Sequence, residues 1–199
     1  MGRRDGNSRN GASLRRWAVP VALAVFAAAG NAAAQVGSDE SAGAWYGVTL
    51  GGSGTRLTCD LCQVSRDVGP SVTLSAGAHG ASNLRVGLEV SAWTHEQEGV
   101  REKIYGLGLV AHLVPDPNRG LYLLGGFGWS GYRAGDLSYD APRVTVGLGW
   151  DVPAFGSWVV GNVIALDGAA FAGLRNEDQT VLRNVGLSAL RFAVQLRRR

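Results

Sequence analysis

Residues 84–94 read Leu-Arg-Val-Gly-Leu-Glu-Val-Ser-Ala-Trp-Thr, with an apolar side chain at every even position from Leu84 to Ala92 and with Arg85 and Glu89 among the odd positions. Such an alternation with a period of two predicts a β-strand. In a water-soluble sandwich the apolar row would face the core, whereas in an outer-membrane barrel it faces lipid and the charges face the lumen. The strand alone does not decide between these two folds, so the rest of the chain must.

The first 34 residues have the three parts of a secretory signal peptide. Five arginines lie within residues 1–16, an apolar run covers residues 17–29, and three alanines at 32–34 offer the small side chains that a signal peptidase recognises. We therefore predict a signal peptide at 1–34 and a mature barrel domain at 35–199. A transmembrane anchor would need about 20 apolar residues, which is more than this run supplies.

Removal of the signal peptide changes the charge of the protein. Five of the 19 Lys and Arg residues and one of the 16 Asp and Glu residues leave with it, so the mature chain carries 14 basic against 15 acidic residues. Binding to nucleic acid depends on an excess of basic residues, and we expect no nucleic-acid partner. Arg197, Arg198 and Arg199 remain as a basic tail, which is expected to be solvated.

The pattern with a period of two recurs along the mature chain. Eight segments are predicted to be strands: 44–54, 69–79, 84–94, 103–114, 120–132, 142–152, 157–167 and 183–196. The connections after the odd-numbered strands are long and polar (55–67, 95–102, 133–141 and 168–182), and those after the even-numbered strands are short. Long outer loops and tight periplasmic turns are typical of a membrane barrel, whereas a Greek-key sandwich does not require them. The predicted fold is an all-β, eight-stranded antiparallel up-and-down transmembrane β-barrel, preceded by a signal peptide.

Aromatic residues gather near both predicted ends of the strands. Those toward the periplasmic ends are Trp45, Tyr46, Tyr122, Trp150 and Trp158, and those toward the outer ends are Trp93, Tyr105, Trp129 and Tyr132. Two such girdles are typical of membrane barrels. Trp93 and Tyr122 have the parity of lumen residues, so ordinary core aromatics remain an alternative.

Several short motifs carry a resemblance to a known family. They are Gly-Gly-Ser-Gly at 51–54, Thr-Cys-Asp-Leu-Cys at 58–62, Gly-Leu-Glu-Val-Ser-Ala-Trp-Thr at 87–94, Pro-Asp-Pro at 115–117 and Gly-Leu-Tyr-Leu-Leu-Gly-Gly at 120–126. With the signal peptide and the eight strands, the mature chain resembles the small eight-stranded outer-membrane barrels of the OmpA and OmpX type, and it is similar to uncharacterised bacterial outer-membrane β-barrel proteins. Such barrels usually end on an aromatic residue, whereas here Phe192 is followed by four strand residues and three arginines.

Cys59 and Cys62 are the only cysteines of the chain and fall in the first predicted outer loop. In an oxidising compartment we expect them to form a local disulfide. A redox-active pair would need a helix N-terminus behind it, and a zinc site would need further ligands, for which the loop offers no histidine.

Five charged residues have the parity of the lumen face: Arg85, Glu89, Arg143, Asp151 and Arg191. The interior of an eight-stranded barrel is just wide enough for side chains to fill it. We therefore expect these charges to pair with one another or with trapped water and to plug the lumen, with a narrow gated pore as the alternative.

The predicted function is that of a bacterial outer-membrane barrel with a structural, adhesive or surface-interaction role, with no catalysis and no cofactor or metal. Three alternatives stay open: a lipid-modifying barrel enzyme with His95 at the outer rim, a narrow pore, and a secreted lipocalin-like binding barrel. His79 and His112 fall toward the periplasmic end, where we expect them to be lumen or interface residues without a catalytic role. The expected partners are outer-membrane lipid and lipopolysaccharide, and the barrel assembly machinery during biogenesis. The extracellular ligand is unknown.

Overall fold

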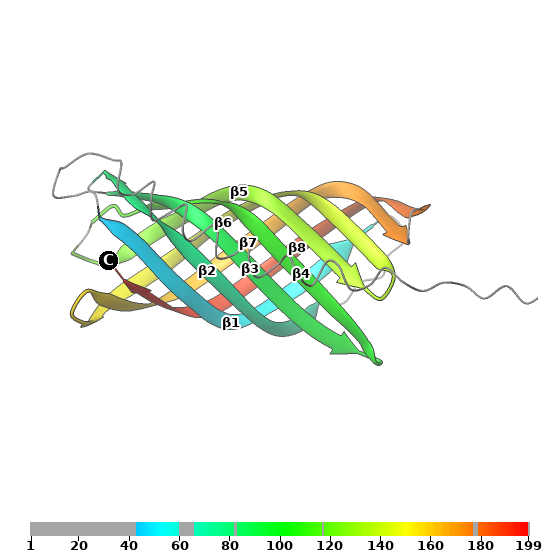
Figure 1. Cartoon of the computed structure of the whole chain (residues 1–199), viewed down its shortest axis with the longest axis horizontal. Helices are drawn as coiled ribbons and strands as arrows, with labels where there is room; N and C mark the ends of the chain where they lie inside the picture. Colours follow the sequence, from blue (N-terminus) through cyan, green and yellow to red (C-terminus); the bar gives the residue numbers. More distant parts are fainter. Residues whose placement is uncertain (1–42, 60–65, 82, 117, 177–178, 199) are drawn as a thin grey trace, which may run out of the picture.

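The computed structural model describes residues 43–59, 66–81, 83–116, 118–176 and 179–198. The predicted signal peptide lies outside these residues. Eight strands make a closed barrel in which each strand pairs antiparallel with the next and β8 pairs with β1 (Figure 1). They are β1 (Ala44–Thr58), β2 (Asp67–Ala81), β3 (Leu84–Gln97), β4 (Val100–Leu113), β5 (Leu121–Ala134), β6 (Leu137–Phe155), β7 (Trp158–Asn176) and β8 (Gln179–Arg198). The predicted fold class is confirmed.

The two ends of the barrel are distinguished by the chain ends. β1 begins and β8 ends at the same end, on the left in Figure 1, and we call this the inner end. The connections that follow β1, β3, β5 and β7 all lie at the opposite, outer end. In bacterial membrane barrels the extracellular connections project further from the membrane than the periplasmic ones. Here the hairpins at the outer end project beyond the apolar surface of the barrel, so we assign the inner end to the periplasm.

The strands extend further toward the outer end than the sequence predicts. β3 and β4 are separated only by Glu98 and Gly99, and β5 and β6 only by Gly135 and Asp136. The predicted loops 95–102, 133–141 and 168–182 are therefore largely strand, and residues 55–58 of the first predicted loop are strand as well. These segments are polar on their outer face, which led to their prediction as loops, but the backbone hydrogen-bond ladder does not need an apolar row to continue.

The outward faces of the strands form a continuous apolar surface, which we call the belt. Its side chains are exposed although they are large and apolar: Phe127 is 65% exposed and Val146 and Val194 are each 53% exposed. Every strand contributes to the belt, with Leu50, Val72, Val86, Leu107, Phe127, Val146, Ile164 and Val194 as one example from each. A water-soluble lipocalin-like barrel would point such rows into a cavity, so this alternative is excluded.

Aromatic side chains border the belt at both ends. Tyr46, Trp150, Phe155 and Trp158 lie toward the inner end, and Tyr105 and Trp129 toward the outer end. The Tyr46 and Trp158 rings pack edge to face, with 5.9 Å between their centroids. Four of the aromatic residues predicted for the girdles point inward instead and are buried, namely Trp45, Trp93, Tyr122 and Tyr132.

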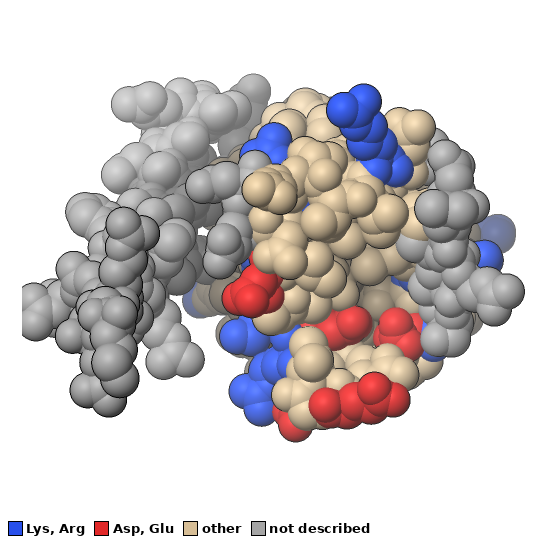
Figure 2. Space-filling view, turned by 90° about the vertical axis from the view of Figure 1, so that its right-hand side faces the viewer, with Lys and Arg blue, Asp and Glu red and all other residues tan. Residues whose placement is uncertain are grey.

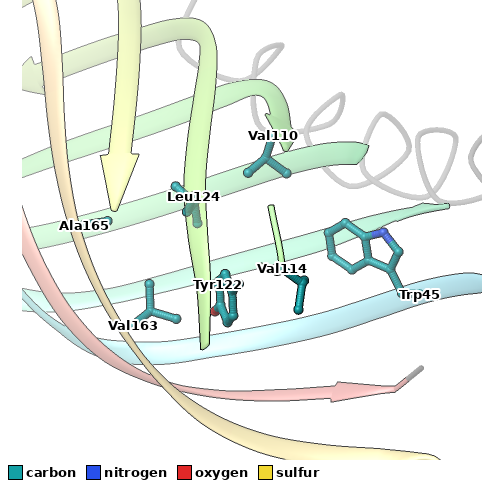
Figure 3. Packing of buried hydrophobic residues seen from close by; sticks show 7 residues of the cluster. All are labelled: Trp45, Val110, Val114, Tyr122, Leu124, Val163 and Ala165. Atoms are coloured by element: carbon teal, nitrogen blue, oxygen red, sulfur yellow. The ribbon is translucent and has the colours of Figure 1, made fainter. Parts of the chain in front are cut away.

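Two apolar clusters occupy the interior, one toward each end. The cluster near the inner end contains Trp45, Val110, Val114, Tyr122, Leu124, Val163 and Ala165, whose side chains point into the barrel around Tyr122 (Figure 3). The cluster near the outer end contains Tyr132, Ala134, Tyr139, Ala141, Leu174, Val185 and Leu187. Among the described residues, no helix is long and apolar enough to cross a membrane.

Candidate functional site

Four charged side chains meet inside the belt, and we call them the central ion cluster: Glu89 of β3, Arg143 of β6, Asp167 of β7 and Arg191 of β8. Glu89 Oε1 lies 3.3 Å from an Arg143 nitrogen and 3.5 Å from an Arg191 nitrogen. Asp167 lies 3.7 Å from each arginine. Each cation therefore contacts both anions, so that the opposite charges offset the cost of taking these groups out of water.

Hydroxyl groups on the strands complete the central ion cluster. Arg143 donates to Ser91 Oγ at 2.9 Å, and Arg191 donates to Thr73 Oγ1 at 2.5 Å. Thr145 donates to Asp167 Oδ1 at 2.6 Å. These small residues alternate with the apolar belt residues along the strands, so their position follows from the period of two. Their hydrogen bonds fix the orientation of the charged groups across the lumen.

A second group of polar side chains, the inner ion cluster, lies nearer the periplasmic end and consists of Arg85, His112, Asp151 and Arg197. Asp151 accepts from Arg85 at 3.3 Å and also from Arg197, and Arg197 donates to His112 Nδ1 at 3.2 Å. All four are at most 8% exposed. Charged groups at this depth are stable only because they are paired.

Aromatic rings surround the inner ion cluster. The Arg197 guanidinium lies 5.3 Å from the centroid of the Tyr122 ring and 5.9 Å from that of Trp45, which are cation–π distances. His112 packs between the same two rings, at 4.8 Å from Tyr122 and 5.1 Å from Trp45. Tyr122 also donates to Gln195 Oε1 at 2.7 Å. The inner end of the lumen is thus filled by interlocked rings and guanidinium groups.

Little space remains between these groups. A void of about 10 Å³ lies between the two ion clusters, lined by residues that include Glu89, His112 and Arg191. A cavity of about 40 Å³ lies on the outer side of the central ion cluster, lined by residues that include Trp93, Ser130 and Arg143. A buried water needs roughly 10–15 Å³, so these spaces suit one to a few waters. At these two places the side chains inside the barrel leave room for only a few waters.

The five predicted lumen charges all lie inside the barrel. The structure places Glu89, Arg143 and Arg191 in the central ion cluster and Arg85 and Asp151 in the inner ion cluster, with exposures between 3% and 8%. Their burial follows from strand parity, whereas the division into two clusters depends on the register between strands.

Two members of the clusters were missed at the sequence level. Asp167 was placed at the very end of a strand whose parity was uncertain. Arg197 was predicted to be part of a solvated tail, but it is 0% exposed, so this prediction is wrong. Strand parity in the sequence would have predicted the burial of Arg197, because Arg197 continues the inward row of Arg191 and Gln195 at steps of two.

The predicted disulfide falls partly outside the described residues. Cys59 is disulfide-bonded. Cys62 is not among the described residues, and the pairing of the two cysteines stays a prediction. No group of three or more His, Cys, Asp and Glu side chains suited to a metal ion is found in the described part of the chain.

The three histidines lie in different surroundings. The Nδ1 atoms of His79 and His95 lie 2.7 Å and 3.0 Å from the backbone carbonyls of Gly43 and Val68, and His112 contacts Arg197. Within the described ranges, no hydrogen bond joins a histidine to a serine. The arrangement therefore gives no support to a Ser-His pair of the kind that nucleophilic catalysis uses.

Comparison with known proteins identifies the fold. No protein-family model and no curated protein matches the chain. Among solved structures, Neisserial surface protein A is 16% identical, with a TM-score of 0.53 and coverage of 77% of this chain and 98% of that one. Ail, the attachment invasion locus protein of Yersinia pestis, is 11% identical, with a TM-score of 0.52 and coverage of 77% and 97%.

At these identities the likeness concerns the fold alone, and the fold is that of the small eight-stranded outer-membrane barrels, as the sequence predicts. The belt supplies the second observation, because an exposed apolar band around a closed barrel with a charged interior requires lipid on its outside. Barrels of this construction span the bacterial outer membrane, and this location is the one that the sequence predicts.

Proposed function

We propose that this outer-membrane barrel is closed to the passage of solutes and acts through its outer end, in a structural or adhesive role. The observation that supports the proposal is the small size of the spaces left between side chains inside the barrel. The inner apolar cluster packs around the inner ion cluster, and the central ion cluster and the outer apolar cluster follow further along the barrel. A conducting pore would need a continuous polar path, and the voids between these groups measure only about 10 and 40 Å³.

The outer end supports a role in contact with other surfaces. β3 and β4 carry their hairpin beyond the belt, and Val68 and Val100 are 68% and 47% exposed near this end. Figure 2 shows the outer end, where the acidic side chains gather in the lower half beside some of the basic ones, on the side to which the β3–β4 hairpin projects in Figure 1. Hairpins that present charged and apolar groups together suit binding to a partner. One solved relative in fold, Ail, is named for attachment and invasion.

Planar-bilayer recording tests whether the lumen is closed. The purified chain is expected to give no stepwise conductance after insertion, which is verified by heat-modifiable gel mobility of the same preparation. A general porin inserted into the same bilayer serves as the positive control. Long-lived steps comparable to that porin would reject the plugged lumen and favour the pore.

Cells that display the protein test its role at the surface. We expect adherence to epithelial cells to fall when the exposed charges Glu96, Glu98 and Arg101 of the β3–β4 hairpin are replaced together by Ser. The matched control replaces Asp116 and Arg119, an exposed ion pair at the inner end, in the same way. Equal adherence of cells with and without the protein would leave a purely structural role.

We infer that the barrel has no catalytic role, which also can be tested. Lipopolysaccharide with labelled acyl chains should be recovered unchanged after incubation with the folded protein. Release or transfer of label that His95→Ala abolishes would reverse this inference and establish the lipid-modifying alternative.

A further inference from the structure

The wall of the barrel has a seam between β2 and β3 at the outer end. Their ladder ends at the pair Ser71 and Trp93, although β2 begins four residues earlier, at Asp67, and β3 continues to Gln97. The neighbouring ladders, β1 with β2 and β3 with β4, run to the ends of these same strands. Pro70 lies in the seam and has no backbone N–H to donate, which accounts for the interruption.

Side chains close the seam in place of the ladder. His95 Nδ1 lies 3.0 Å from the Val68 carbonyl oxygen, across the seam from β3 to β2. The His95 ring stacks on Trp93, with 6.0 Å between centroids, and Trp93 donates to the Ser53 carbonyl at 2.9 Å. Trp93 therefore lies between the outside of the barrel and the cavity of about 40 Å³ on the outer side of the central ion cluster.

A groove of about 780 Å³ lies along the outside of this seam. Its apolar lining includes Leu50, Val68, Pro70, Val72, Ala92 and Tyr105. Leu50 and Val72 belong to the belt, so the groove continues from the lipid-facing surface up to the outer border of the membrane. A groove of this size is typical of sites that hold small molecules.

Basic side chains lie at the outer edge of the groove. Lys103 and Arg101 both line it, together with His95. Arg101 is paired with Glu96 at 3.0 Å, whereas Lys103 is exposed and forms no ion pair with any described residue. The groove therefore combines an apolar floor with an available cation at the level where lipid headgroups lie.

We propose that this groove binds the lipid A part of lipopolysaccharide, with an acyl chain along the floor formed by Ala92 and Val72 and a phosphate at Lys103. The ligand must be amphiphilic, because the lower part of the groove faces hydrocarbon and its upper edge carries positive charge. It must be anionic, because basic residues at a membrane surface attract anionic lipid. It must reside in the outer leaflet, because the groove lies at the outer border of the belt.

Native mass spectrometry of the folded mature chain in mild detergent tests the proposal. Three probes are titrated separately: bisphosphorylated lipid A, the same lipid A without phosphates, and phosphatidylethanolamine. We expect roughly tenfold tighter binding of bisphosphorylated lipid A than of the dephosphorylated form, because one charge-assisted contact to phosphate supplies about this factor. Lys103→Ala should abolish this preference, and Ala92→Phe should weaken both forms of lipid A by filling the groove.

Two matched variants act as controls. Arg119→Ala removes an exposed cation at the inner end, and Ala111→Phe enlarges an outward alanine of β4 away from the groove. Both should bind like the unchanged protein. Heat-modifiable mobility verifies folding, and if Ala92→Phe does not fold, Lys103→Ala still decides. The proposal would be overturned if bisphosphorylated lipid A bound no more tightly than dephosphorylated lipid A or phosphatidylethanolamine. It would also be overturned if Arg119→Ala and Lys103→Ala lost binding equally. Both outcomes are independent of whether the lumen conducts.

Discussion

Two parts of the same strand, β6, have opposite polarity. In the belt, Val144 and Val146 face outward and are 59% and 53% exposed, while Arg143 faces the lumen and is buried. A few residues earlier, toward the outer end, Tyr139 and Ala141 face inward and are at most 1% exposed. We call the strand parts that continue beyond the belt toward the outer end the outer extension; in β6 it comprises residues 137–141. The period of two is unbroken through both parts, so the difference lies in what surrounds the barrel: lipid around the belt, and water around the outer extension.

The interior changes together with the exterior. Within the belt the lumen holds ion pairs, whereas within the outer extension it holds the apolar cluster around Tyr132, Tyr139 and Val185. The outer extension thus follows the rule of soluble proteins, and the belt follows the rule of membrane barrels. The same strands run through both the belt and the outer extension. The same kind of substitution should therefore have different effects on stability in these two parts.

The largest contrast is expected for the loss of an acidic partner. Glu89→Ala removes one anion of the central ion cluster and leaves Arg143 and Arg191 with Asp167 alone, which should cost about 3–5 kcal/mol of unfolding free energy. Glu96→Ala breaks the pair with Arg101 in the outer extension, where both side chains are more than half exposed, and should cost at most about 1 kcal/mol. Equilibrium urea unfolding in lipid vesicles measures both.

The double variant Glu89→Leu with Arg191→Leu separates pairing from packing. It should recover part of the loss, because it removes a cation together with the anion. If Glu89→Ala and Glu96→Ala were equally mild, the central ion cluster would be solvated and the contrast between belt and extension would fail.

A new charge on the outer surface should show the next largest contrast. Val146→Arg places a guanidinium in the lipid-facing belt and should cost about 2–4 kcal/mol. Val100→Arg makes the same change in the outer extension, where Val100 is 47% exposed, and should alter stability by less than about 0.5 kcal/mol. The same urea unfolding titration in lipid vesicles measures both variants. The two sites are compared because Val146 faces lipid and Val100 does not. Similar costs at both positions would mean that the belt does not face lipid.

The sequence predicts the belt well because lipid imposes a strict pattern there. Val144, Val146 and Leu148 alternate with Arg143 and Asp151 over a full crossing, and eight such segments predict the closed barrel. The burial of charges follows from parity once the membrane is inferred. Which charges meet does not follow, because Arg191 reaches Glu89 from five strands away along the chain, through the closure of the barrel.

The outer extension was harder to predict for a physical reason. Its strands expose polar residues such as Asp140 to water and bury Tyr139 and Leu187, so their composition resembles that of a loop. Trp45 and Tyr132 were assigned to the girdles by position along the strand, whereas parity places both inside. Position along a strand and parity must therefore be used together.

Truncation of a valine should give a smaller contrast of the same kind. Val185→Ala opens space in the outer apolar cluster, where Val185 is 1% exposed, and should cost about 2 kcal/mol through lost burial and the cavity left behind. Val146→Ala removes the same atoms from the belt, where lipid fills the space, and should cost no more than about 1 kcal/mol. Urea midpoints of the two variants provide the comparison, and a larger loss at Val146 would contradict it.

The smallest effect is expected at the tip of the β3–β4 hairpin, and it should be a gain. Glu98 and Gly99 have φ values of 51° and 80°, and two positive φ values are what a type I′ turn requires. Asparagine adopts this conformation more readily than glutamate, so Glu98→Asn should stabilise the protein by about 0.5 kcal/mol. Asp136→Asn in the β5–β6 turn is the matched control, because there only Gly135 has positive φ and no gain is expected. Since the hairpin lies in water beyond the belt, the gain should be the same in detergent and in lipid vesicles, and a gain seen only in vesicles would place the hairpin within the membrane.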